Sequence, residues 1–123
     1  MAKIIVVDDD KAATTLFEQV LLMNSYEVVT LNESKKTIEA ANKFHPDLFI
    51  LDLMMPEPDG FKLCRMLRAD PLYRRTPILI VTALNDTDSH LVAIGAGAND
   101  YLVKPFHIDQ LLATIEKQLN KSK

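Results

Sequence analysis

The sequence is short of cysteine and of long apolar runs. Its single cysteine, Cys64, excludes an internal disulfide and is typical of a reducing compartment. We expect Cys64 to be a small, semi-buried apolar residue on a helix. No apolar run reaches the roughly 18 residues that a membrane-spanning helix needs. The residues Met1-Ala2-Lys3 lead directly into a strand-like run without a signal peptide. These absences predict a cytoplasmic protein that does not contact a membrane.

The chain also lacks a strong charge of either sign. It has 14 basic and 17 acidic residues, a formal net charge of -3, and no basic cluster. This balance argues against direct contact of the domain with nucleic acid. The 123 residues have the size of one domain, which buries roughly two-thirds of the surface of its unfolded chain. No repeat, low-complexity tract or linker interrupts the sequence, so we expect a single domain over 1–123.

Strand-like and helix-like segments alternate along the chain. Short runs rich in Val, Ile and Leu predict buried strands, and amphipathic segments with capping residues predict helices. The first helix is expected to be capped by Asp10 and to bury a stripe that includes Leu16, Val20 and Met23. The predicted strands span 3–8, 26–31, 47–52, 77–82 and 100–103, and the predicted helices span 11–23, 33–44, 60–69, 86–95 and 107–120.

This alternation predicts an α/β fold with a doubly wound, five-stranded parallel sheet and helices on both faces. The expected strand order is 2-1-3-4-5, which places the topological switch point between the first and third strands. Asp8 and Asp9 end the first of these strands, and Asp52 ends the other. Ligands bind at such switch points, so the topology and the chemistry indicate the same place.

Polar residues follow four apolar strands at their carboxyl ends. Asp52 is the single acid within an apolar run from Leu48 to Pro56, where a carboxylate is costly to desolvate. Thr82 and Lys104 follow the fourth and fifth strands. Because the ends of parallel strands line one crevice, these side chains are expected to lie close together.

The predicted cluster suits a phosphoryl group on a carboxylate. Asp8, Asp9 and Asp52 would repel one another, and a divalent cation removes that repulsion. Ligands that are all oxygen favour Mg²⁺ over Zn²⁺. Lys104 offers a point charge for a phosphoryl oxygen, and the Thr82 hydroxyl can donate to another. The residues therefore predict an acidic site that binds Mg²⁺ and forms an aspartyl phosphate.

These motifs, in this order, resemble the receiver domain of two-component response regulators, including chemotaxis regulators. The resemblance covers essentially the whole chain and implies a flavodoxin-like fold. Each motif is weak alone, but together, each at its own strand end, they are specific. They comprise Asp8-Asp9, Asp52-Leu53-Met54-Met55-Pro56, Asp59-Gly60, Thr82-Ala83 and Lys104-Pro105.

The resemblance implies that Asp52 accepts a phosphoryl group from the phosphohistidine of a histidine kinase or histidine phosphotransfer protein. Asp9 and Asp52 would bind Mg²⁺ directly with the backbone carbonyl of Met54, and Asp8 would act through a metal-bound water. Lys104 would pair with Asp52 before transfer and with the phosphoryl group afterwards, next to a cis bond to Pro105. The domain would catalyse only its own phosphorylation and dephosphorylation.

The resemblance also implies a switch. Thr82 would move toward the phosphoryl group and Tyr101 would turn inward, although Tyr101 could instead be a strand aromatic with a solvated hydroxyl. The side chains of Met54 and Leu84 would lie beside the path of the hydrolytic water and obstruct it. A downstream protein target or the protein's own output domain would then bind a partner face, which comprises Asn85, Thr87, His90, Ile94 and Tyr101.

Three other functions are weighed against this one. A hydrolase with an aspartyl intermediate usually has a second carboxylate soon after the nucleophile, whereas Leu53 and Met54 follow Asp52. A flavodoxin-type cofactor domain would have a Gly-, Ser- or Thr-rich loop after the first strand, where this chain has Asp8-Asp9-Asp10. A scaffold pseudo-receiver would lack acceptor residues, and all of them are present.

Overall fold

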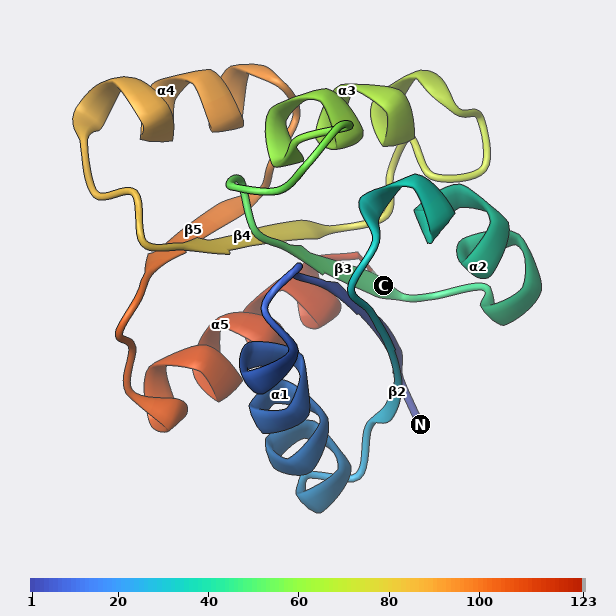
Figure 1. Cartoon of the computed structure of the whole chain (residues 1–123). Helices are drawn as coiled ribbons and strands as arrows, with labels where there is room; N and C mark the ends of the chain where they lie inside the picture. Colours follow the sequence, from blue (N-terminus) through green and yellow to red (C-terminus); the bar gives the residue numbers. More distant parts are fainter. Residues whose placement is uncertain (123) are drawn as a thin grey trace.

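Five parallel strands form one sheet in this computed structural model, which describes residues 1–122. The strands are β1 (Lys3–Val7), β2 (Glu27–Leu31), β3 (Leu48–Leu51), β4 (Ile78–Thr82) and β5 (Asp100–Val103). The helices are α1 (Lys11–Met23), α2 (Thr37–Phe44), α3 (Gly60–Ala69), α4 (Thr87–Gly95) and α5 (Ile108–Lys121). The strand order is β2-β1-β3-β4-β5, which confirms the predicted fold (Figure 1).

The helices cover both faces of the sheet. α1 and α5 lie on one face, and α2, α3 and α4 lie on the other (Figure 1). Side chains of β1 alternate between the two layers: Ile4 and Val6 pack with α1 and α5, and Ile5 and Val7 pack on the opposite face. Because both faces are covered, β3 is apolar throughout, and β1 and β4 are apolar except for Lys3 at the start of β1 and Thr82 at the end of β4.

Short polar side chains begin two of the helices as the sequence predicts. Asp10 accepts a hydrogen bond from the backbone N–H of Ala12, at 2.9 Å, before α1. Asp59 accepts one from the N–H of Lys62, also at 2.9 Å, before α3. Each carboxylate satisfies a backbone donor that the first helical turn leaves without a partner.

Two local predictions about the helices are wrong. Leu16 and Met23 are exposed, and the buried face of α1 is formed by Phe17 and Leu21 together with Val20. The sequence carries apolar residues on more than one side of this helix, and only its packing against β1 and α5 selects the buried side.

The second helix also begins later than predicted. The residues Ser34–Lys36 form a 3-10 turn, and α2 starts at Thr37. The Ser34 hydroxyl donates to the carbonyls of Pro56 and Pro58, so it holds the segment against the loop that follows β3. This tertiary contact favours the tighter turn over regular helix.

Gly60 allows α3 to start directly against the end of β3. A Cβ atom at this position would lie 2.2 Å from the carbonyl oxygen of Asp52 and 2.5 Å from the Cα of Leu53. Both neighbours are backbone atoms that cannot rotate away, so only glycine fits. Cys64, one turn further along α3, is fully buried rather than semi-buried, and burial raises the pKa of its thiol.

No helix among residues 1–122 is long and apolar enough to cross a membrane.

Arg68 joins three segments behind α3. Its guanidinium donates to the carbonyls of Gly97, Tyr73 and Thr76 at 2.7–2.9 Å. It also donates to the side-chain carbonyl of Asn99 at 2.7 Å. Gly97 has a φ of 113° and leaves no space for a Cβ atom beside the arginine stem. No sequence signal identifies this role of Arg68, because its partners lie in loops and are not placed by helix periodicity.

We expect Arg68→Ala to lower the free energy of unfolding by about 2–3 kcal/mol, because it removes charged donors from several carbonyls at once. Arg65→Ala is the matched control, since Arg65 lies on the exposed side of the same helix and should change stability by less than about 0.5 kcal/mol. Urea denaturation measures both values. Equal losses in the two variants would contradict the role of Arg68.

Candidate functional site

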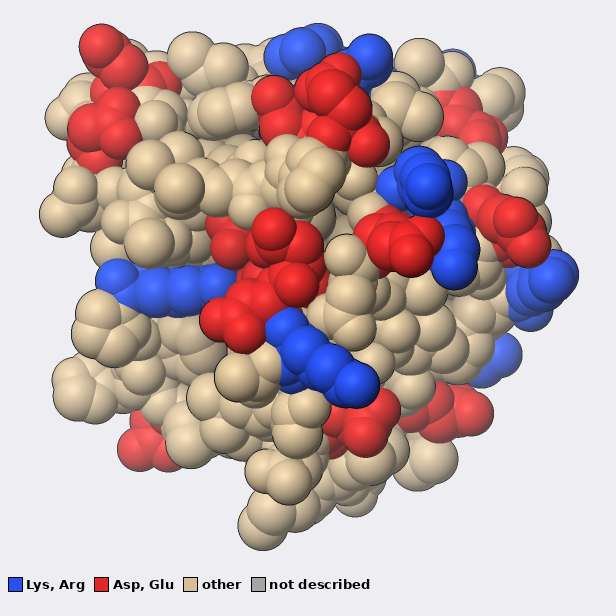
Figure 2. All heavy atoms as spheres, in the orientation of Figure 1, with Lys and Arg blue, Asp and Glu red and all other residues tan. Residues whose placement is uncertain are grey.

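Four predicted side chains converge where the parallel strands end. Asp8 follows β1, Asp52 follows β3, Thr82 ends β4 and Lys104 follows β5. Figure 2 shows acidic side chains gathered near the middle of this face, over the ends of β1 and β3. The site lies at the switch point that the strand order defines.

The ammonium group of Lys104 lies between two carboxylates. Its Nζ is 2.6 Å from Oδ2 of Asp8 and 3.1 Å from Oδ2 of Asp52. Only 2% of Asp8 and 8% of Asp52 are exposed. Two buried carboxylates would repel each other, and the shared ammonium offsets that repulsion and their lost hydration.

The protonation equilibria reflect this arrangement. Burial raises the pKa of Asp8 above its usual value, against the opposing hydrogen bond and charge of Lys104. Burial lowers the pKa of Lys104, but its hydrogen bonds and its attraction to Asp8 and Asp52 outweigh burial, and the net pKa is raised. Lys104 therefore stays cationic over the physiological pH range, as an electrostatic role requires.

Backbone donors fix the other oxygen of each carboxylate. Oδ1 of Asp52 accepts a hydrogen bond from the N–H of Met54 at 3.1 Å. Oδ1 of Asp8 accepts one from the N–H of Asp10 at 2.9 Å. Both carboxylates are thus oriented before any ligand binds, which reduces the reorganisation that a reaction requires.

The donors available to a metal are few and all oxygen. Asp9 is exposed and makes no side-chain hydrogen bond or ion pair within residues 1–122. In that part of the chain, no three Asp, Glu, His or Cys side chains form a ready metal-binding group. Mg²⁺ needs no such group, because it commonly binds one or two carboxylates, water and a phosphate. The carboxylates of Asp9 and Asp52 with the Met54 carbonyl fit that requirement.

Thr82 is connected to Tyr101 through the backbone of one residue, Leu84. The buried Thr82 Oγ1 accepts a hydrogen bond from the N–H of Leu84 at 3.4 Å. The Leu84 carbonyl accepts a hydrogen bond from the Tyr101 hydroxyl at 2.7 Å. The tyrosine is half-buried, and burial, with the charges of Asp86 and Asp52, raises its pKa. Its hydroxyl has a specific partner, which argues against a merely solvated aromatic.

The predicted partner-face residues lie together. Each lines one hollow of about 350 Å³ beside α4 and β5. Ile94, although apolar, is 42% exposed. The lining residues are Asn85, Asp86, Thr87, His90, Leu91, Ile94, Tyr101 and Val103.

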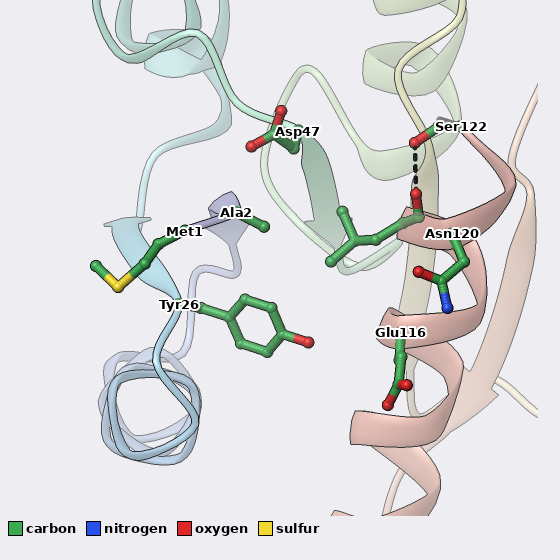
Figure 3. Close-up of a pocket in the computed structure, with 8 residues that line it drawn as sticks. Met1, Ala2, Tyr26, Asp47, Glu116, Asn120 and Ser122 are labelled. Atoms are coloured by element: carbon green, nitrogen blue, oxygen red, sulfur yellow. Dashed lines mark hydrogen bonds between the residues drawn. The ribbon is translucent and has the colours of Figure 1, made fainter.

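Two other hollows differ in chemistry and position. A mainly apolar groove of about 570 Å³ lies between α1 and the start of α5, and Lys104 and Phe106 contribute to it. A hollow of about 540 Å³ lies at the opposite end of the sheet, between the amino ends of the strands and α5 (Figure 3). Tyr26 and Glu116 face each other across it, far from the cluster around Asp52.

Two features of the site escaped the sequence analysis. Lys104 lies closer to Asp8 than to Asp52, although the resemblance named only Asp52 as its partner. The N–H and the carbonyl of Leu84 link Thr82 to Tyr101, and no sequence pattern predicts such a link through backbone groups. The Lys104-Pro105 bond is cis as the resemblance implied, and Glu57-Pro58 is cis as well.

Comparison with known proteins identifies the family. The family model for the response regulator receiver domain matches residues 4–116. The response regulator MprA of Mycobacterium leprae is 38% identical over 123 residues, which cover 98% of this chain and 52% of that protein. The chain therefore spans about half the length of such curated relatives.

Solved structures agree. A putative response regulator from Chloroflexus aurantiacus superposes with a TM-score of 0.92 at 34% identity, covering 97% of this chain and 98% of that one. The activated receiver domain of RstA from Klebsiella pneumoniae gives a TM-score of 0.89 at 33% identity, covering 95% and 97%. The whole described architecture is shared with proteins of one signalling family, and the chain belongs to the receiver domains of two-component response regulators.

Proposed function

We propose that Asp52 accepts a phosphoryl group from a phosphohistidine and that the domain catalyses only this transfer and the later hydrolysis of its own aspartyl phosphate. One observation carries the proposal. Asp52 is a buried carboxylate, oriented by the Met54 N–H and held 3.1 Å from the Lys104 ammonium, at the switch point of the sheet. A nucleophile in that position needs positioning and charge neutralisation, and both are supplied.

The transfer exchanges one bond to phosphorus for another. An Asp52 carboxylate oxygen attacks phosphorus, the phosphorus–nitrogen bond of the donor breaks, and the imidazole leaves with the bonding electron pair. Lys104 then faces a more negative group and moves its ammonium toward a phosphoryl oxygen, while Asp8 remains beside it. The Thr82 hydroxyl is free to donate to a second phosphoryl oxygen, since it accepts only the long bond from Leu84.

The proposed cofactor is Mg²⁺. Asp9, Asp52 and the Met54 carbonyl would hold it, with Asp8 acting through a metal-bound water. When bound, Mg²⁺ neutralises negative charge on the carboxylates and the phosphoryl oxygens. The exposed Asp9 is accessible for this role without disturbing the Lys104 contacts.

Two other functions find less support. An aspartyl-phosphate hydrolase usually has a carboxylate general acid close after the nucleophile, but Leu53 and Met54 occupy those positions. Asp8, which shares Lys104 with Asp52, is already bound to that ammonium group and to the Asp10 N–H. A phosphorylation-independent scaffold would not require this complete, oriented set of acceptor groups.

The proposed partners follow from the same site. A histidine kinase or histidine phosphotransfer protein would supply the phosphoryl group. A protein target or output domain would bind at the hollow beside α4. The apolar groove next to Lys104 supports a protein donor, because it adjoins the acceptor and offers little polar surface for a small anion. We place the domain, one unit over 1–123, in the cytoplasm, where the buried Cys64 thiol would remain reduced.

We expect acetyl phosphate or phosphoramidate with Mg²⁺ to add one acid-labile phosphoryl group to the protein. Asp52→Asn should abolish this addition, because an amide is not a nucleophile at neutral pH. Intact mass spectrometry measures the product. Asp47→Asn is the control, since Asp47 precedes β3 at the far end of the sheet. Labelling that survives in Asp52→Asn, or that is unaffected by EDTA, would refute the assignment.

We expect Asp9→Ala to weaken Mg²⁺ binding by on the order of tenfold or more. Replacing a residue that only hydrogen-bonds to a metal ligand already has an effect of that size, and Asp9 is proposed as a ligand itself. Asp10→Ala should have little effect, because Asp10 caps α1 through the Ala12 N–H. Titration with Mg²⁺, followed by NMR or fluorescence, compares the variants. Equal affinities would mean that the wrong member of the acidic triplet has been assigned to the metal.

We expect the aspartyl phosphate to persist. Met54 is largely exposed and Leu84 is half-buried, and neither side chain can orient a hydrolytic water. Met54→Asn combined with Leu84→Glu should speed hydrolysis by on the order of tenfold, because polar groups can position that water. The measurement is the decay of phosphorylated protein after removal of the donor. Unchanged decay in the double variant would show that the two side chains do not control the rate.

A further inference from the structure

The imidazole of His90 stacks on the ring of Tyr101. The two ring centroids are 4.6 Å apart and the planes are inclined by 17°. His90 belongs to α4 and Tyr101 to β5, so the stack joins the helix to the edge strand of the sheet. This is a favourable geometry for two flat rings.

α4 has few other strong attachments. Ala93 is its only buried residue, and Leu91, Val92 and Ile94 are exposed. A helix with so little buried surface is held weakly and can shift at low energetic cost. The aromatic contact is therefore one of the contacts that fix its position, together with the buried Ala93.

The stack ends a continuous series of contacts that starts at the acidic site. Thr82 Oγ1 accepts the Leu84 N–H, the Leu84 carbonyl accepts the Tyr101 hydroxyl, and the Tyr101 ring stacks on His90. The Thr82 hydroxyl can donate its hydrogen to a phosphoryl group. Any shift of Thr82 that follows would move the Leu84 backbone, and with it the carbonyl that the Tyr101 hydroxyl binds.

We propose that His90 is a positioning residue whose stacked imidazole makes α4 follow the position of Tyr101. The proposal rests on the proposed phosphorylation of Asp52 and concerns how the partner-binding hollow responds to it. Tyr101 cannot leave its present place without losing the stack, unless His90 and its helix move as well. His90, Tyr101 and Ile94 line the same hollow, so this coupled motion would reshape it.

Three variants separate stacking from other roles of this helix. His90→Ala removes the ring, and His90→Phe restores a flat aromatic face without the ring nitrogens. Leu91→Ala is the control, because Leu91 is 64% exposed and lines the same hollow without joining the stack. His90 is itself exposed, so none of these changes opens a cavity in the core.

The experiment compares amide chemical shifts before and after addition of beryllium fluoride and Mg²⁺. In the wild type, in His90→Phe and in Leu91→Ala, shift changes should extend from Asp52 and Thr82 to the amides of α4. In His90→Ala, the changes around Asp52 and Thr82 should remain, whereas those along α4 should be lost.

Two results would overturn the inference. In the first, α4 of His90→Ala responds as strongly as in the wild type. In the second, His90→Phe behaves like His90→Ala, so that stacking is not the cause. Acetyl phosphate labelling of the same proteins tests the proposed function separately. If all variants are labelled, the phosphoacceptor role of Asp52 stands, whether or not the chemical shifts of α4 respond. If the wild type is not labelled, that role is refuted.

Discussion

The position of one ammonium group between two buried carboxylates organises the functional end of this molecule. Lys104 lies 96 residues from Asp8 and 52 residues from Asp52 along the chain, yet it contacts both. Neither carboxylate could remain buried as an anion without a compensating charge nearby. The sheet must therefore bring the ends of β1, β3 and β5 to one point, and the three charges stabilise one another only there.

The sheet makes that point rigid. β1, β3 and β4 are covered on both faces and have almost no exposed side chain. Gly60 lets α3 begin against the Asp52 carbonyl, and Ser34 ties the loop after β3 to the loop after β2. The acceptor carboxylate thus lies on a tightly packed support, as a preorganised site requires.

The opposite property holds on the side of α4. This helix has a single buried residue, and its contacts with the sheet include one stacked ring pair. A rigid site next to a weakly held helix suits a domain that converts a local change of charge into a change of surface. Tightly packed cores resist deformation, whereas an element with little buried area can occupy two positions of similar energy.

Local sequence patterns were sufficient to predict the architecture and the residues that gather at the site. Short apolar runs predicted the strands, and their alternation with helices predicted the parallel sheet. The polar residues at the strand ends predicted where the crevice lies. Asp8, Asp52, Thr82 and Lys104 were found in this way because position at a strand end is a local property, and the parallel topology then brings all such ends together.

The contacts that those residues make depend on how the whole chain packs. The tertiary structure placed Lys104 nearer to Asp8 than to Asp52 and buried Phe17 in place of Leu16. It gave Arg68 two partners in the loop after its own helix and two in the loop after α4. It also stacked His90 on Tyr101. These outcomes depend on the rotation of helices about their axes and on distances between segments remote in sequence. Local periodicity and capping do not encode those quantities, because the packing of the whole chain fixes them.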